Sequence, residues 1–228
     1  MNEHTSKDFG TELKALRARL VAMGRRGEEQ VALAMRAYAE RDDATAQMVI
    51  QNDEMIDRDE SEIDELAFTT LATRQPVASD LRVITMSLKF VVDLERIGDL
   101  ATGIARRVLE LNSLPALDRG VVDPTRLAAL VLKNLRAAMD AFVKEDAEAA
   151  TAAIAADAEI DRLNASLFQE LLELGSREPA SVARVLPMSS ICRYLERIGD
   201  HVKNLAEEVV YMVRATDLRH RPLPPPRN

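Results

Sequence analysis

The sequence predicts an all-α protein built from two tandem, similar three-helix bundles. Residues that lose little conformational freedom on entering a helix dominate, whereas the chain has 8 glycines, no tryptophan and only 4% aromatic residues. Apolar residues recur at helical spacing in six segments, three in each half. The hexapeptide LERIGD occurs twice, beginning at Leu94 and again at Leu195, 101 residues later, which indicates an internal duplication.

Three helices are expected in a first bundle at residues 9–113, after a flexible segment at residues 1–8. Asp42 or Asp43 would cap the second helix, because an aspartate side chain accepts hydrogen bonds from the free amides of a first turn. Pro76 suits the first turn of the third helix. The expected helices cover residues 9–40, 42–74 and 76–112. Gly24 and Gly27 flank two arginines and are interpreted as a kink in the first helix.

The second bundle is expected at residues 123–216, after a turn-like linker at residues 114–122. Asp123 and Pro124 are typical of a cap followed by a first helical residue. The proline-rich residues 217–228 cannot pack as a helix and are expected to be a disordered tail. The three helices of this bundle are expected at residues 124–145, 146–176 and 179–215.

Composition excludes several classes of protein. A formal net charge of −8 offers no basic face for nucleic acid. No apolar run approaches the roughly 18–20 residues that cross a bilayer, and the first residues have no signal-peptide core, so no membrane insertion is expected. With Cys192 as the one cysteine, an internal disulfide is excluded, which is typical of a cytoplasmic protein.

The repeated hexapeptide places two acids on one side of each helix. Residues four apart on a helix have Cβ atoms about 5–6 Å apart, so Glu95 and Asp99 face the same way. Glu196 and Asp200 repeat this pair. The glycine inside each hexapeptide costs about 0.5–1 kcal/mol relative to alanine, which indicates that a neighbouring helix or a ligand approaches the backbone there.

A second acidic pair accompanies each hexapeptide. Asp53 and Asp57 are four apart on the expected second helix, and Asp157 and Asp161 repeat the spacing on the fifth. Like charges at this spacing destabilise a helix, and the repulsion between facing pairs grows as the dielectric constant falls. Protonation, arginine partners or bound cations would relieve that repulsion.

Arginines stand beside these acids in sequence but are expected to point elsewhere, because each directly follows an acid and is turned by about 100° around the helix axis. A lone acidic pair is usually a solvated face, but four matched pairs favour bound cations. Carboxylates with few imidazole or thiolate groups suit hard or borderline cations such as Mg²⁺, Mn²⁺ or iron. The arginines are Arg58, Arg96, Arg162 and Arg197.

These motifs resemble the PhoU family of phosphate-transport accessory and regulatory proteins. The resemblance implies a cytoplasmic, dimeric, all-α protein of two three-helix bundles that binds multinuclear iron or zinc clusters through E/D-x-x-x-D motifs. It also implies a negative regulator that links a phosphate ABC transporter to a sensor histidine kinase. The segments that carry the resemblance are DEMID (53–57), RQPVASDLR (74–82), LKFVVDLERIGDLATGIA (88–105), DAEID (157–161) and YLERIGDHVKNLAEEVVY (194–211).

By this resemblance each repeat would hold one metal centre, with manganese or magnesium as alternatives to iron or zinc. Asn204, four residues after an acid of the second hexapeptide, would be an accessory ligand, and the first repeat has Gly103 in its place. Asp80 and Arg82 are expected to fix the start of the third helix. The ligands would be Asp53, Asp57, Glu95 and Asp99 in the first repeat and Asp157, Asp161, Glu196 and Asp200 in the second.

Enzymatic activity is not expected. The three histidines do not form the Glu-x-x-His spacing of a ferritin-like di-iron oxidase, and no P-loop, G-x-S-x-G elbow or Cys–His pairing is present. His201 directly follows a candidate ligand, is turned to another face, and is expected at the surface. Cys192 is expected in the core as a small apolar residue.

The expected function is a metal-binding cytoplasmic adaptor that negatively regulates the phosphate-starvation response and modulates phosphate uptake. Its partners would be the ATPase of a phosphate ABC transporter, the sensor histidine kinase and a second copy of the chain, as a homodimer. It would reach the inner face of the membrane only through these partners. Two alternatives stay open: a metal-storage or redox metalloprotein with a di- or multinuclear centre, and a metal-free helical scaffold.

Overall fold

The described residues of this protein, 3–74, 76, 78–115 and 122–216 of a computed structural model, form helices and short connections, so the all-α prediction is confirmed. The expected tail at residues 217–228 and most of the expected linker lie outside the described residues. The elements are α1 (Glu3–Glu40), α2 (Asp43–Arg74), α3 (Ala78–Ser113), α4 (Thr125–Lys144), α5 (Ala147–Arg177), the 3₁₀ turn η1 (Pro179–Ser181) and α6 (Val182–Arg214).

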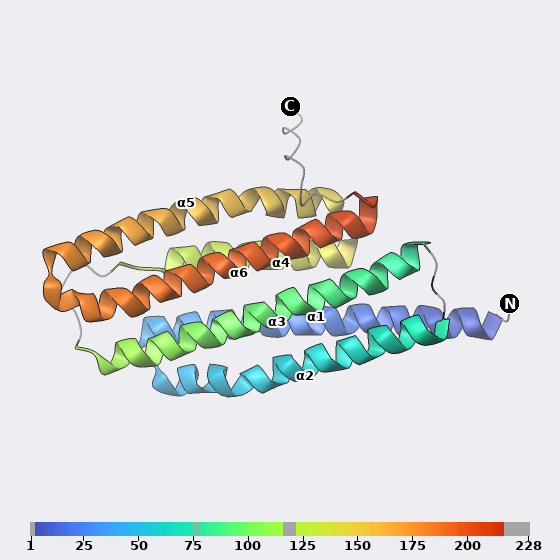
Figure 1. Cartoon of the computed structure of the whole chain (residues 1–228), viewed down its shortest axis with the longest axis horizontal. Helices are drawn as coiled ribbons and strands as arrows, with labels where there is room; N and C mark the ends of the chain where they lie inside the picture. The colour runs from blue at the N-terminus through green and yellow to red at the C-terminus, as the bar shows by residue number, and fades with distance from the viewer. Residues whose placement is uncertain (1–2, 75, 77, 116–121, 217–228) are drawn as a thin grey trace, which may run out of the picture.

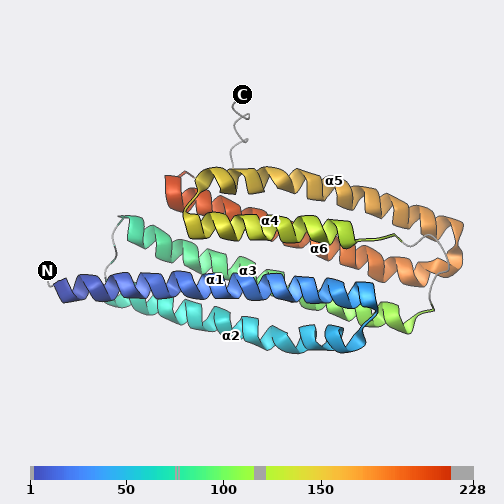
Figure 2. The ribbon, with the colours of Figure 1, turned by 180° about the vertical axis from the view of Figure 1, so that it is seen from behind.

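The helices form two three-helix units that lie side by side (Figure 1). Helices α1, α2 and α3 contact one another in the first unit, and α4, α5 and α6 do so in the second. The units meet where α3 runs antiparallel to α6 and where α1 lies beside α4. Helices α2 and α5 are therefore outermost at opposite edges, and α1 and α4 cover the back of the molecule (Figure 2).

Aspartates cap two of the helices, α2 as the sequence predicts and α5, whose Asp146 was expected inside the helix. Asp42 Oδ1 accepts the amide of Ala44 at 2.9 Å, and Asp146 Oδ1 accepts the amide of Glu148 at the same distance. Such caps contribute about 1 kcal/mol each. Asp123 Oδ1 accepts a hydrogen bond from the first residue of α4, but Pro124 occupies the cap position, so the cap predicted at Asp123 is wrong by one residue.

Three predicted starts differ from the structure. Helix α1 begins at Glu3, six residues before the expected start, and residues 179–181 form a 3₁₀ turn ahead of α6. Helix α3 begins at Ala78, so Pro76 lies outside it and not in its first turn.

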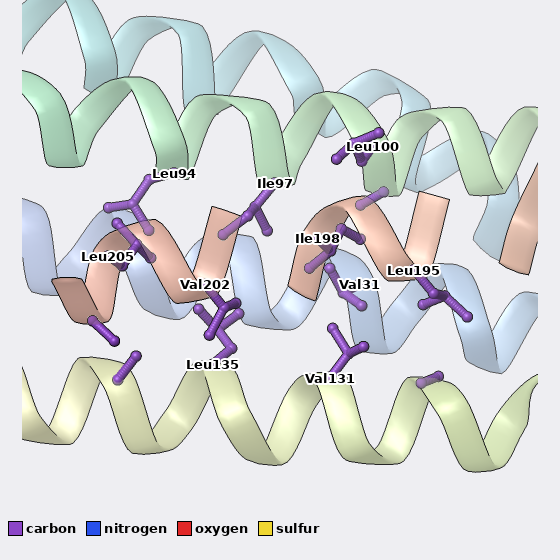
Figure 3. Packing of buried hydrophobic residues seen from close by; sticks show 14 of the residues in the cluster. Val31, Leu94, Ile97, Leu100, Val131, Leu135, Leu195, Ile198, Val202 and Leu205 are labelled. Carbon is purple, nitrogen blue, oxygen red and sulfur yellow. The ribbon is translucent and has the colours of Figure 1, made fainter. Parts of the chain in front are cut away.

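The two units share one continuous apolar core. Figure 3 shows side chains of α3 and α6 meeting those of α1 and α4 across the junction between the units. Leu94, Ile97, Ile198 and Leu205 are at most 1% exposed, and each fully buried aliphatic side chain contributes about 1.5–3 kcal/mol. The apolar stripe of the hexapeptide helix therefore joins the two repeats, while the acids of the same helix face outward.

Gly24 and Gly27 do not break α1, so the predicted kink is wrong. The helix continues from Glu3 to Glu40 through both glycines. A Cβ atom on Gly24 would overlap the side chain of Met139 on α4, and one on Gly27 would lie 3.5 Å from Ile97 on α3. These glycines therefore serve the close packing of α1 against its neighbours.

Polar contacts fix how α3 and α6 cross. Asp93 Oδ1 accepts a hydrogen bond from Asn204 Nδ2 at 3.1 Å and lies 2.7 Å from His201 Nδ1. At the repeat-equivalent positions, a Cβ on Gly103 would lie 3.2 Å from the ring of Tyr194. Because 93 and 194, like 103 and 204, are 101 residues apart, the interface is nearly self-complementary, as in a two-fold dimer. None of the described helices is long and apolar enough to cross a membrane.

Candidate metal centres

The first acidic cluster lies between α2 and α3. Asp53 and Asp57 come from α2, and Glu95 and Asp99 come from α3. The two helices approach closely because α3 has glycine at position 98: a Cβ there would lie 2.5 Å from Cδ1 of the buried Ile56. The glycine of the hexapeptide thus positions a neighbouring helix, one of its two predicted roles.

The acids of the first cluster influence one another across the two helices. Burial raises the pKa of Glu95 to about 7 from its ordinary 4.5, and the carboxylates of Asp99 and Glu60 add to the rise. Burial also raises the pKa of Asp53, and Asp99 and Asp57 raise it further, while the Thr102 hydroxyl opposes the rise by hydrogen bonding. Acids of α2 and α3 are therefore close enough for their charges to interact, as the predicted convergence requires.

Glu60 belongs to this cluster, although the predicted ligand set omits it. Burial raises the pKa of Glu60, and the nearby charges of Asp64, Asp57 and Asp99 add to that effect. The signal in the sequence is its position three residues after Asp57, on the same face of α2. The first cluster therefore has at least five carboxyl groups rather than four.

Arg96 corrects the prediction that the neighbouring arginines point away from the acids. Its Nη1 lies 3.0 Å from Asp99 Oδ2, and its Nε lies 3.4 Å from Glu95 Oε2. Residues three apart are neighbours on a helix, and the long arginine side chain spans the distance between them. The direction of the Cα–Cβ bond around the helix axis, on which the prediction was based, does not take this length into account. Because the Arg96 side chain is 53% exposed, this pair is screened by water. Arg162, in contrast, donates to the carbonyl of Ala158.

The second acidic cluster lies between α5 and α6 and repeats the first. Burial raises the pKa of Glu196, and Asp200, Asp161 and Asp157 add to the rise. Burial likewise raises the pKa of Asp200, with Asp157 and Asp161 adding to it. The charges of all four predicted ligands of the second repeat therefore act on one another, and their role as ligands stays a prediction. A Cβ on Gly199 would lie 3.1 Å from Cγ2 of Ile160, which repeats the glycine–isoleucine contact of the first unit.

Lys203 is the residue of the second cluster that the sequence analysis missed. Its Nζ donates to Asp157 Oδ2 at 2.9 Å, and the Asp157 side chain is only 3% exposed. This hydrogen bond raises the pKa of Lys203. The other oxygen of Asp157, Oδ1, is buried and has no hydrogen-bond partner among the described residues. A Cβ on Gly199 would stand 3.5 Å from that oxygen, so a side chain at this position would bring an apolar atom into contact with it.

The donor chemistry of both clusters suits hard cations, but the carboxylates are not closed around a common point. Oxygen donors from two helices meet in each cluster, and Asp157 Oδ1 is a buried acceptor without a donor. Among the residues that the structure describes, no three histidine, cysteine or acidic side chains are arranged so that they could hold an ion as they stand. Side-chain rotation, with displacement of Arg96 or Lys203, would have to precede binding.

Three other predicted residues lie away from the acids. Asn204 donates its amide to Asp93 on α3, so in this structure it fixes the junction between the units. His201 joins it there, with 19% of its side chain exposed, and the expected surface position is wrong. Cys192 is 3% exposed and burial raises the pKa of its thiol to about 12, in agreement with its predicted place in the core.

Asp80 and Arg82 lie at the start of α3, as expected for residues that fix a helix terminus. Asp80 is in the first turn, where the helix dipole favours a negative charge. Arg82 Nε is buried without a hydrogen-bond partner among the described residues. Neither side chain is part of the acidic clusters.

The duplicated architecture is also found in known proteins. The family model described as the PhoU domain matches residues 20–108 and 125–209, once in each three-helix unit. The chain belongs to the PhoU family. A relative from Pseudomonas putida, named phosphate-specific transport system accessory protein PhoU homolog, is 43% identical over 220 residues, which cover 96% of this chain and 86% of the relative. The PhoU protein of Escherichia coli K12, named phosphate-specific transport system accessory protein, is 32% identical over 223 residues, or 96% and 91% of the two chains.

Solved PhoU structures have the same arrangement of helices. The crystal structure of PhoU from Pseudomonas aeruginosa superimposes with a TM-score of 0.88 at 41% identity and covers 91% of this chain and 100% of that one. The phosphate transport system regulatory protein PhoU from Streptococcus pneumoniae gives a TM-score of 0.85 at 28% identity, with 92% and 98% covered. The predicted family and the predicted fold are thereby confirmed.

Proposed function

We propose that this protein is a metal-binding adaptor that negatively regulates the phosphate-starvation response. In this role it would contact the ATPase of a phosphate ABC transporter and a sensor histidine kinase, act from the cytoplasm as a homodimer, and modulate phosphate uptake. The observation that carries the proposal is the match of a PhoU domain to each repeat, together with relatives whose names assign them to the phosphate-specific transport system.

The acidic clusters would supply the metal sites of this adaptor. Asp53 and Asp57 of α2 and Glu95 and Asp99 of α3 would hold ions in the first unit, and the equivalent acids of α5 and α6 would do so in the second. A bound cation would supply the positive charge that these partly buried carboxylates lack. The protein's own contribution is to place oxygen donors on two helices, which the glycine–isoleucine contacts hold close together.

Coupling to partners would follow from this placement. The acids of the clusters come from α2 and α3 in the first unit and from α5 and α6 in the second. Of these helices, α2 and α5 form opposite outer edges of the molecule (Figure 1). Neutralising the carboxylates would draw the outer helix of each unit onto the inner one. The surface that α2 and α5 offer to a transporter or a kinase would then depend on occupancy of the clusters.

A genetic experiment tests the regulatory role. Deletion of the gene should give high alkaline phosphatase activity in phosphate-rich medium, and the wild-type gene should restore repression. A gene carrying Asp53→Asn and Asp57→Asn should restore it less well, whereas Asp140→Asn with Glu173→Gln, two exposed acids outside the clusters, should restore it fully. Unchanged repression in the deletion strain would contradict the regulatory function.

A metal-free scaffold is the second candidate, and the ion pairs of Arg96 and Lys203 favour it. In both clusters a basic side chain already offsets part of the negative charge. The scaffold would restore repression in the deletion strain with the Asp53→Asn and Asp57→Asn protein as well as with the wild type. A metal store would instead take up and release metal, and a redox protein would cycle its bound metal between oxidation states. The adaptor requires neither.

A further inference from the structure

Besides the extra Glu60 of the first cluster, the two acidic clusters differ at the position that contacts the first aspartate of the D-x-x-x-D motif. Asp53 of the first repeat corresponds to Asp157 of the second, 104 residues later, as DEMID corresponds to DAEID. Thr102 corresponds to Lys203, 101 residues later, the spacing of the two hexapeptides. This aspartate, half-buried at position 53 and buried at position 157, therefore meets a hydroxyl group in the first unit and an ammonium group in the second.

Lys203 occupies the place that a cation would take in the second cluster. Its Nζ lies 2.9 Å from Asp157 Oδ2, and only 3% of the Asp157 side chain is exposed. A hydrogen bond to a buried charge is stronger than an exposed ion pair, because water does not replace it. An incoming ion must break this bond before it can bind Asp157 through Oδ2.

Asp157 Oδ1 indicates that the site is built for a ligand and that the lysine fills it only in part. This oxygen is buried without a hydrogen-bond partner among the described residues, beside the bare backbone of Gly199. A buried carboxylate oxygen that lacks a donor costs folding free energy. The ammonium group satisfies one oxygen of the carboxylate and leaves the other open.

The basic residue of the first cluster does not close it in the same way. Arg96 contacts Asp99, whose side chain is 43% exposed, and its own side chain is 53% exposed. Exposed pairs of this kind contribute little to stability and are readily exchanged for other counter-ions. At the half-buried Asp53, the first cluster has the Thr102 hydroxyl group as hydrogen-bond donor and the charge of Arg106 nearby, in place of the hydrogen-bonded lysine of the second cluster.

We infer that Lys203 is a built-in counter-ion that restricts cation binding in the second repeat, so that metal binds preferentially in the first. Lys203 is thus a selectivity-determining residue for the two centres, and the repeats are chemically unequal despite their common fold. This inference rests on the proposed metal binding. It predicts that the residue at this position, and not the number of carboxylates, sets which centre fills first.

The test transfers the residue of the first repeat to the second. In a background of Asp53→Asn and Asp99→Asn, which disables the first cluster, Lys203→Thr should bind Mn²⁺ or Zn²⁺ about ten- to a hundred-fold more tightly than the same protein with lysine, as measured by titration calorimetry. Lys203→Arg should retain the weak binding. Lys89→Met removes a lysine from another carboxylate, Glu208, and should leave the affinity unchanged.

Stability of the metal-free protein gives a second readout. Lys203→Thr and Lys203→Met should lower the melting temperature in the presence of EDTA, because Asp157 then lacks a counter-ion, and added Mn²⁺ should restore it. Equal affinity of the threonine and lysine proteins at the second cluster, or a melting temperature that metal does not restore, would overturn the inference. Absence of binding at the first cluster alone would overturn the proposed metal centre there and with it the preference for the first repeat. A gain of affinity on Lys203→Thr would still show that the lysine restricts binding in the second repeat.

Discussion

Ile56 fills the space in which a Cβ of Gly98 would stand, and this contact sets the distance between the helices that carry the first acidic cluster. The separation from the Ile56 Cδ1 atom would be 2.5 Å, whereas the equivalent Cβ on Gly199 would lie 3.1 Å from Ile160. Both contacts lie one residue before an acid of the hexapeptide and one residue before an acid of the paired motif. The repeated glycine is therefore a packing requirement of the seam.

Gly98→Ala should destabilise the protein by about 1–2 kcal/mol, because the overlap with a buried isoleucine exceeds the gain in helix propensity. Gly199→Ala should cost less, since its contact is looser. Gly10→Ala, where nothing lies within 4 Å, should be neutral or stabilising. Urea unfolding of the three variants measures the order, and equal effects at Gly98 and Gly10 would contradict the packing argument.

Glu95→Gln should stabilise the metal-free protein at pH 8 and flatten its pH dependence. The folded-state pKa of Glu95, about 7, exceeds the ordinary 4.5, so between these values the folded protein binds a proton more tightly than the unfolded chain. The contribution of Glu95 to the free energy of unfolding is therefore greatest below about pH 4.5 and falls as the pH rises towards 7. The amide removes this loss, with a gain of about 1 kcal/mol after allowance for solvent screening.

Urea unfolding at pH 5 and pH 8 with EDTA measures this effect. The variant and the wild type should differ more at pH 8 than at pH 5. Glu173→Gln, at an exposed acid, is the control and should shift stability equally at both values. A stability difference between variant and wild type that is larger at pH 5 than at pH 8 would contradict the raised pKa of Glu95.

Asp93→Ala should weaken the junction between the two units by about 1–3 kcal/mol, because His201 and Asn204 lose a shared acceptor. Asp140→Ala, which removes an exposed acid 3.8 Å from Lys144, should change stability by less than about 0.5 kcal/mol. Thermal unfolding of both variants in EDTA separates the two cases. Similar melting temperatures would show that the apolar core alone fixes the crossing of α3 and α6.

Cys192 should be unreactive towards thiol reagents in the folded protein. Its side chain is buried and burial raises the pKa of the thiol to about 12, so the reactive thiolate is scarce at pH 8. Labelling should follow the rate of unfolding and become complete in concentrated denaturant. Rapid labelling under native conditions would place the thiol at the surface and contradict the assignment to the core.

The sequence predicts the helices and the acidic clusters well because both depend on local spacing. Helical periodicity and aspartate caps locate all six helices, and four-residue spacing locates the acids. Lys203 escapes such reasoning, because its contact with Asp157 joins residues 46 apart on different helices. The same holds for His201 and Asp93, which meet only because the two units cross at α3 and α6.

The glycines of α1 show a second limit of sequence reasoning. Gly24 and Gly27 have the local pattern of a kink, yet what they accommodate is Met139 and Ile97 of other helices. Arg96 shows a third, since side-chain length and not the angle around the axis decides which acid it reaches. In these cases the outcome depends on contacts between different helices or on the reach of a side chain, and neither can be read from the local spacing of residues.

Metal content after dialysis tests the central claim most directly. Wild-type protein equilibrated with iron, zinc or manganese should retain metal, and Asp53→Asn with Asp57→Asn should lose the metal of the first repeat although both acids of α3 remain. Asp140→Asn with Glu173→Gln should retain it in full. A wild-type protein that holds no metal, or a pair of α2 substitutions that leaves the content unchanged, would contradict the account.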